Sequence, residues 1–202
     1  MQMTLRWYGS KHDTVTLEQI RQIPGVKSVI TTLYDSVPGE AWAVEDIRAM
    51  KQEVEAAGLT IAGIESVNIH DAIKIGSPDR EHYIENYITT LERLGQEGIR
   101  MVCYNFMPVF DWLRSELEHQ NEDGSNSLAY DELAVLAMNP LTSELSLPGW
   151  DSSYTQEEVR DLISAYSVLG EEGLWKNLEH FLKRIIPVAE ECGVKMAIHP
   201  DD

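Results

Sequence analysis

The stretch Gly193-Val194-Lys195-Met196-Ala197-Ile198-His199-Pro200-Asp201-Asp202 ends one amphipathic helix and forms one short apolar strand. Glycine commonly follows the last turn of a helix, and the apolar residues after Gly193 predict a strand over 194–199. An imidazole and two carboxylates come at the end of this strand, and such side chains bind divalent metals or transfer protons. The stretch is therefore typical of one repeat of an α/β enzyme, with the rim of an active site at its end.

The same alternation of helices and short apolar strands runs back along the chain, which is the pattern of parallel βαβ units. Capping boxes at Thr16/Gln19 and Thr155/Glu158 predict helix starts, and Ser77-Pro78 predicts another. Further helices are predicted over 44–57 and 174–192, the last with a kink at Pro187. The predicted strands cover residues 3–8, 26–31, 59–65, 99–106 and 194–199.

This pattern favours an α/β fold of the (β/α)8 TIM-barrel type, of which the chain supplies roughly the first five βα units. A doubly wound sheet is less favoured, because no G-x-G-x-x-G loop follows the first strand. We expect residues 1–202 to form a single, incomplete barrel domain that belongs to a longer polypeptide. Residues 107–170 are too long for an ordinary connection and predict an inserted, partly helical lid after the fourth strand.

The composition narrows the range of partners. A formal net charge of -18 argues against binding to nucleic acid, because like charges would have to be brought together. We find no signal peptide and no apolar stretch long enough to span a bilayer, so we expect a cytoplasmic enzyme without a membrane partner. Cys103 and Cys192 lack a CxxC spacing and predict buried, reduced thiols; a disulfide is the weaker option.

Side chains alternate along a strand, and this predicts which of them face the interior of a barrel. In the last strand Val194, Met196 and Ile198 suit the helix side, which turns His199 inward at the top of the strand. A neutral imidazole there would be a good ligand for a divalent metal, and Asp201 could transfer a proton. The alternative is a histidine bonded to a neighbouring carbonyl group and followed by a solvated acidic turn.

The first strand gives the same kind of prediction. Its Met3, Leu5 and Trp7 suit the helix side, which leaves Arg6 inward, where its guanidinium could hold a carboxylate with two hydrogen bonds. An ion pair between Arg6 and Glu65 is the alternative. Asn105, at the end of the fourth strand, could bond a sugar hydroxyl. The predicted substrate-binding residues are Arg6, Glu65, Asn105 and Trp7.

With these residues in view, the chain resembles the mannonate dehydratases, a family of sugar-acid lyases of hexuronate breakdown. The resemblance rests on five motifs taken together in this order. They are Leu5-Arg6-Trp7-Tyr8-Gly9, Gly63-Ile64-Glu65-Ser66, Asn105-Phe106-Met107-Pro108-Val109-Phe110-Asp111-Trp112, Leu147-Pro148-Gly149-Trp150 and Met196-Ala197-Ile198-His199-Pro200-Asp201-Asp202.

The resemblance implies a barrel of the xylose-isomerase-like type that binds Mn²⁺ or Fe²⁺ and converts D-mannonate to 2-keto-3-deoxy-D-gluconate and water. By this similarity His199 would be one metal ligand, whereas the family's other ligands lie on later strands and have no counterpart in this sequence. We expect a small-molecule sugar acid as substrate, and a homo-oligomer.

Two alternatives remain at this point. One is a metal-dependent sugar isomerase or epimerase on the same barrel, which would use similar ligands but a different proton route. The other is a non-catalytic fragment that assembles with another chain, because a partial barrel exposes strand edges that pair readily.

Overall fold

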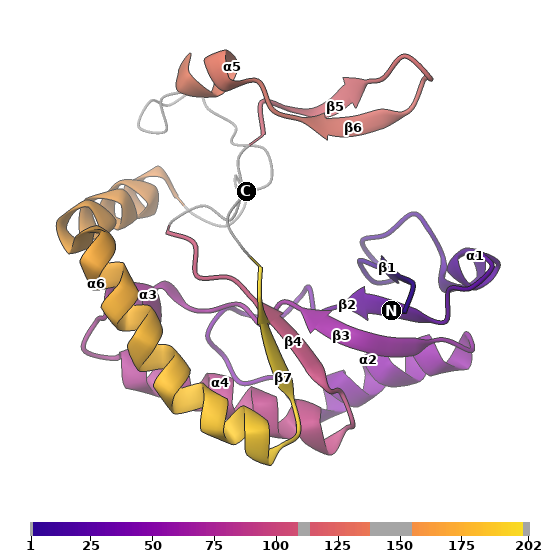
Figure 1. Ribbon diagram of the computed structural model, residues 1–202, viewed down its shortest axis with the longest axis horizontal. Helices are drawn as coiled ribbons and strands as arrows, with labels where there is room; N and C mark the ends of the chain where they lie inside the picture. The colour runs from indigo at the N-terminus through magenta and orange to yellow at the C-terminus, as the bar shows by residue number, and fades with distance from the viewer. Residues whose placement is uncertain (1, 109–113, 138–154, 200–202) are drawn as a thin grey trace. The chain divides into compact units, whose positions relative to one another are not determined.

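The computed structural model describes residues 2–108, 114–137 and 155–199, apart from the side chain of residue 156 (Figure 1). These residues form two compact units. One is drawn from 2–106 and 175–199, and the other lies within 107–174. That residues 1–202 form one domain with an insertion over 107–170 stays a prediction.

The first unit contains a sheet of five parallel strands in the order β1-β2-β3-β4-β7, so its fold is α/β with a parallel sheet. Each strand lies within a stretch that the sequence predicted. Their bounds are β1 (Thr4–Arg6), β2 (Ser28–Thr31), β3 (Thr60–Glu65), β4 (Met101–Tyr104) and β7 (Lys195–Ile198). Among the described residues β1 and β7 are the edges of this sheet, and the closed barrel stays a prediction.

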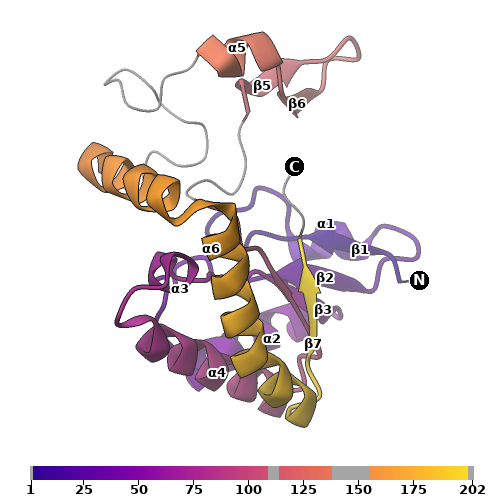
Figure 2. The same cartoon turned by 60° about the vertical axis from the view of Figure 1, so that its left-hand side comes forward.

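Helices connect these strands, and α2, α4 and the part of α6 from Trp175 onward lie along one side of the sheet (Figures 1 and 2). The Thr16/Gln19 capping box is present at the start of α1. Helix α4 begins after Asp79 instead of after Ser77, and the short helix α3 was not predicted. The bounds are α1 (Leu17–Arg21), α2 (Val44–Ala56), α3 (Asp71–Ile75), α4 (Arg80–Gln96) and α6 (Gln156–Glu191).

Helix α6 joins two predicted helices into one element, and its backbone leaves the helical region at Gly170 (φ 66°, ψ 175°). A positive φ is accessible to glycine because it has no Cβ. The sequence predicted a kink at Pro187, which lies inside this helix, and that kink stays a prediction. Beyond Gly170 the predicted apolar face is confirmed, since Phe181, Ile185 and Ala189 are each at most 1% exposed.

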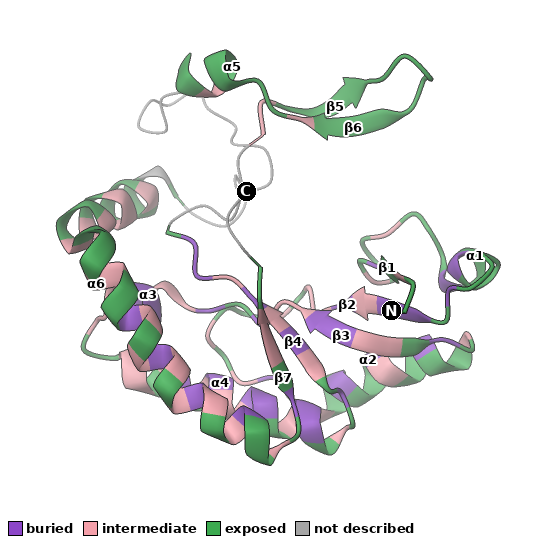
Figure 3. Cartoon of the chain, viewed as in Figure 1, coloured by how far each residue is buried: buried purple, intermediate pink, exposed green. Residues whose placement is uncertain are grey.

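The second unit contains an antiparallel hairpin, β5 (Glu116–Gln120) with β6 (Asn126–Ala129), followed by α5 (Glu132–Ala137). The sequence predicted only helices here, so the hairpin corrects it. The turn-rich stretch 122–126 closes the hairpin, with Asn121 N donating to Ser125 O (2.8 Å) and Gly124 at a positive φ. Figure 3 shows that the hairpin is exposed along β5 and over most of β6. The predicted capping box at Thr155/Glu158 is present.

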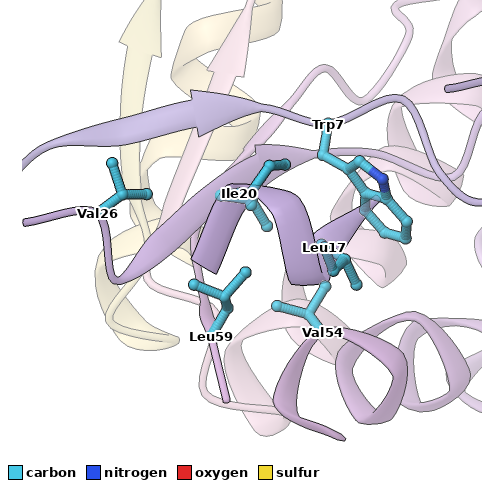
Figure 4. Packing of buried hydrophobic residues seen from close by; sticks show 7 residues of the cluster. Trp7, Leu17, Ile20, Val26, Val54 and Leu59 are labelled. Carbon is cyan, nitrogen blue, oxygen red and sulfur yellow. The ribbon is translucent and has the colours of Figure 1, made fainter. Parts of the chain in front are cut away.

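The apolar core of the first unit packs between the sheet and its helices. One buried cluster joins β1 and β2 to α1 and α2, with Trp7 at its margin (Figure 4). It consists of Trp7, Leu17, Ile20, Val26, Val29, Val54 and Leu59. On α6, Phe181 packs against the rings of Tyr87 and Phe106, whose centroids lie 5.0 and 6.0 Å from its own. Burying such aromatic rings is a large favourable contribution to folding.

The two faces of the sheet differ as strand alternation requires. Ile64 and Val102 are register partners on the helix side and are fully buried, whereas the next pair, Glu65 and Cys103, is only half-buried. The sequence prediction fails at both edges of the described sheet. Met3 and Leu5 are exposed, as is Ile198, because an edge strand has a neighbouring strand on one side only.

Candidate functional site at the carboxyl end of the sheet

Arg6, the last residue of β1, lies at the centre of a polar cluster. Its Nη1 is 2.6 Å from Glu65 Oε1 at the end of β3, and its Nε donates to the Tyr34 hydroxyl at 3.1 Å. Its guanidinium also lies over the Tyr8 ring, 5.1 Å from the centroid. The ion pair that the sequence suggested is therefore present, with both side chains about one-third exposed (32% and 29%).

Within this cluster the Arg6 guanidinium stays charged and the Tyr34 hydroxyl stays neutral. Burial alone would lower the pKa of Arg6, but the Tyr34 hydrogen bond and the Glu65 charge outweigh it and raise this pKa. Burial raises the pKa of Tyr34, against the opposing effect of Arg6. Tyr34 was not predicted as a site residue. Its signal in the sequence is a tyrosine shortly after the end of the second strand.

Cys103 extends the cluster into β4, because it is the register partner of Glu65. Burial raises the pKa of its thiol, and so does the negative charge of Glu65, while Arg6 opposes them. Both Cys103 and Cys192 are free, as predicted, although each is half-buried and not fully buried. Cys103 and Asn105 are two residues apart along the predicted fourth strand, so their side chains should point to the same face. This spacing could have placed Cys103 in the cluster from the sequence alone.

His199 continues the hydrogen-bond ladder between β7 and β4. Its backbone N donates to Tyr104 O at 2.7 Å, and the residue is exposed. Within the part of the chain that the structure describes, no group of three or more His, Cys, Asp or Glu side chains could hold a metal ion. The described residues could therefore supply one ligand of a metal site but not a complete set of ligands. Asp201 lies outside the described residues.

The other two predicted substrate-binding residues take different positions. Asn105 is half-buried directly after β4, next to the buried Tyr104. Trp7 is 2% exposed and belongs to the apolar cluster on the helix side of the sheet. Strand alternation thus separates Trp7 from Arg6, and the structure does not bring it to the Arg6–Glu65 cluster. Its contact with substrate stays a prediction.

His70, in the segment between β3 and α3, has a structural role. Its Nδ1 accepts a hydrogen bond from Ala72 N (3.1 Å) and so caps α3. Its ring stacks on Tyr83, with centroids 3.7 Å apart. Gly39 completes the contact, since a Cβ at that position would come within 2.8 Å of both rings. Burial lowers the pKa of His70, as an accepting nitrogen requires.

A parallel α/β sheet that gathers charged side chains at the carboxyl ends of its strands is the arrangement of α/β enzymes. The D-mannonate dehydratase (UxuA) family model matches residues 1–202. The chain therefore belongs to the D-mannonate dehydratase family.

Individual relatives agree with this assignment. The chain is 55% identical over 202 residues to a mannonate dehydratase of Streptococcus uberis and 53% identical over 203 residues to one of Streptococcus pneumoniae, with all of this chain and 58% and 55% of those proteins covered. The crystal structure of mannonate dehydratase from Streptococcus suis serotype2 superposes with a TM-score of 0.88 at 48% identity, covering 100% of this chain and 54% of that one. The chain thus spans little more than half the length of these relatives.

Proposed function

We propose that this chain contributes substrate-binding and metal-binding residues to an enzyme that dehydrates D-mannonate to 2-keto-3-deoxy-D-gluconate. The enzyme would be a (β/α)8 barrel that uses Mn²⁺ or Fe²⁺. Membership of the family supports the reaction, and the polar cluster at the carboxyl end of the sheet supports the location of the site.

The observation that carries the proposal is the arrangement of Arg6. Two of its nitrogen atoms are engaged, Nε by Tyr34 and Nη1 by Glu65. A guanidinium has further N–H donors, which remain for the carboxylate of a sugar acid. The chain is strongly acidic overall, so a fixed cation at this point offsets the repulsion that an anionic substrate would otherwise meet.

The predicted chemistry assigns a task to each residue. Dehydration removes the proton from C2 of the sugar acid, next to its carboxylate, and expels the C3 hydroxyl group. Arg6 would bind the carboxylate and stabilise the negative charge that develops there, with Glu65 and Tyr34 holding the guanidinium in place. Asn105 would orient substrate hydroxyl groups, and Asp201 would take or return a proton.

His199 would supply one ligand to the metal, because its backbone is fixed to β4 at the top of β7. When bound, the metal would stabilise the enediolate charge and help hydroxide leave. The imidazole must be neutral to coordinate, so binding should weaken as the pH falls.

A chimera tests this function directly. The chain would replace the matched residues of the Streptococcus uberis relative, and 2-keto-3-deoxy acid formed from D-mannonate with Mn²⁺ would be measured after periodate and thiobarbiturate treatment. We expect turnover that a chelator abolishes. A folded, metal-loaded chimera that leaves D-mannonate unchanged, or that only epimerises it, would contradict the proposal.

Substitutions in the same chimera locate the site. Arg6→Lys should lower kcat/KM about 10- to 100-fold, because a lysine cannot make the two-point contact with a carboxylate. His199→Ala should lower Mn²⁺ affinity by about tenfold or more. Arg48→Lys is the matched control, since Arg48 pairs with Glu97 on the helix layer and should leave kcat/KM unchanged.

Two further expectations remain proposals. None of the helices that the structure describes could span a bilayer. We also propose that the enzyme is located in the cytoplasm. We further propose a homo-oligomer, whose mass light scattering of the purified chimera would measure.

A further inference from the structure

The hydroxyl group of Tyr34 has a hydrogen-bond donor that the polar cluster around Arg6 does not use. Its oxygen accepts from Arg6 Nε at 3.1 Å, so the hydrogen of this O–H group is directed to some other atom. A phenol donates one hydrogen bond as well as accepting. Within the part of the chain that the structure describes, no atom accepts this hydrogen. Burial raises the pKa of Tyr34, so the hydroxyl keeps its hydrogen at neutral pH.

The bond to Nε fixes where the Tyr34 hydroxyl lies along the guanidinium. The Nε–H bond and one N–H bond of Nη2 point the same way, which is why a guanidinium can donate two parallel hydrogen bonds to one carboxylate. The Tyr34 oxygen occupies the first of these two acceptor positions. Glu65 holds Nη1 at 2.6 Å, so Nη2 presents the second position. An oxygen atom bound at Nη2 would therefore lie beside the Tyr34 O–H group.

The loop that carries Tyr34 is fixed to the segment after β1. The Tyr34 ring packs against the rings of Tyr8 and His12, with centroids 5.4 and 6.0 Å away. The next residue, Asp35, pairs with Lys11 Nζ at 2.7 Å and with His12 Nε2 at 3.0 Å. A donor that is already held in place loses little freedom when a ligand binds to it.

A ligand can reach this group from solvent. The side chains of Arg6 and Glu65 are 32% and 29% exposed, and Tyr34 is half-buried. The donors of the cluster are thus at the surface of the carboxyl end of the sheet and not enclosed in the core.

We propose that Tyr34 is a substrate-binding residue, whose O–H group donates to the same carboxylate oxygen that accepts from Arg6 Nη2. This assignment rests on the proposed function, in which Arg6 binds the carboxylate of D-mannonate. Two donors on one oxygen bind the carboxylate and stabilise the further negative charge that it takes up when the C2 proton leaves. Tyr34 then has two tasks, since it also holds Arg6 Nε.

Turnover of D-mannonate by the chimera tests the assignment. Tyr34→Phe keeps the ring that packs on Tyr8 and removes only the hydroxyl group. Its kcat/KM should fall about tenfold or more, as for the loss of a hydrogen bond to a charged group. Tyr83→Phe is the matched control, because Tyr83 stacks on His70 in the helix layer and should keep the kcat/KM of the unmodified chimera.

A double-mutant cycle separates contact with the substrate from positioning of Arg6. In an Arg6→Lys background no Nε–H group remains for Tyr34 to hold, so a tyrosine that acts only through Arg6 would have no further effect. A hydroxyl that itself donates to the carboxylate keeps its contribution. In this background Tyr34→Phe should still lower kcat/KM about threefold or more.

Each contrary result has a distinct meaning. If the unmodified chimera turns over D-mannonate and a folded Tyr34→Phe variant keeps its full kcat/KM, the assignment of Tyr34 is overturned while the proposed function stands. A loss that disappears in the Arg6→Lys background also overturns it, because Tyr34 would then only position Arg6. An unmodified chimera that is folded, metal-loaded and inactive overturns the proposed function itself.

Discussion

The two faces of the sheet at its carboxyl end treat consecutive residues in opposite ways. Ile64 is fully buried against the helices, and Glu65, the next residue, reaches Arg6 across β2 on the other face. On β1 the same contrast separates Trp7 from Arg6. One face therefore holds the fold together, while the other presents charge. Moving by one residue along a strand therefore separates side chains that stabilise the fold from side chains that are available for chemistry.

Truncation on the buried face should have the largest effect on stability. Ile64→Ala removes apolar atoms at a site without solvent contact and should lower the free energy of unfolding by about 2–5 kcal/mol. Glu65→Gln, one residue away, should lower it by less than about 1 kcal/mol, because a partly exposed ion pair contributes little. Urea unfolding of both variants measures this contrast. Equal losses would show that the two faces are not distinct.

The next largest effect on stability should come from a fall in pH, through His70 at the start of α3. The folded-state pKa of His70 lies below its ordinary value of 6.5, so its contribution to stability is complete above that pH and is lost as the pH falls through the folded-state pKa. His70→Asn keeps a capping side chain without a titrating ring. Its melting temperature should fall less than that of the unmodified chain between about pH 7 and 5. The exposed His119→Asn variant should follow the unmodified chain.

The smallest expected effect concerns the thiol on the charged face. The pKa of Cys103 is raised above 9.0 by burial and then by Glu65, so at about pH 8 little thiolate is present. In a Cys192→Ser background, Glu65→Gln should lower this pKa and speed alkylation by iodoacetamide about twofold or more. Arg6→Gln should slow it, because the opposing cation is lost. Identical rates in all three proteins would contradict the electrostatic coupling.

The sequence predicted the parts of the fold that follow from short stretches of neighbouring residues. Apolar runs located the five strands of the parallel sheet, and periodic spacing located the buried face of α6 with Phe181 and Ile185. The β5–β6 hairpin was missed because its strands are mostly polar and every residue of β5 is exposed. Such strands show no alternation of apolar and polar residues. Helix α3 has only 5 residues, which is too few for a periodic pattern in the sequence. Its N-cap residue, His70, is positioned by a tertiary contact with Tyr83.

The site was predictable to the extent that it follows strand parity. Strand alternation predicted that Arg6 faces inward, an ion pair with Glu65 was its alternative role, and the structure brings these two side chains together. Tyr34 was not found, because it comes from a loop whose path depends on packing and not on a period.

In the proposed function, a sugar acid binds on the Arg6 face of the sheet. Arg6 Nε–H and Trp7 Nε1–H report the two faces in a single ¹⁵N–¹H spectrum of the chain titrated with D-mannonate. We predict that the Arg6 signal shifts in a saturable way, that Arg6→Lys removes the response, and that Trp7 moves less. A saturable shift of Trp7 with an unmoved Arg6 signal would contradict the claim.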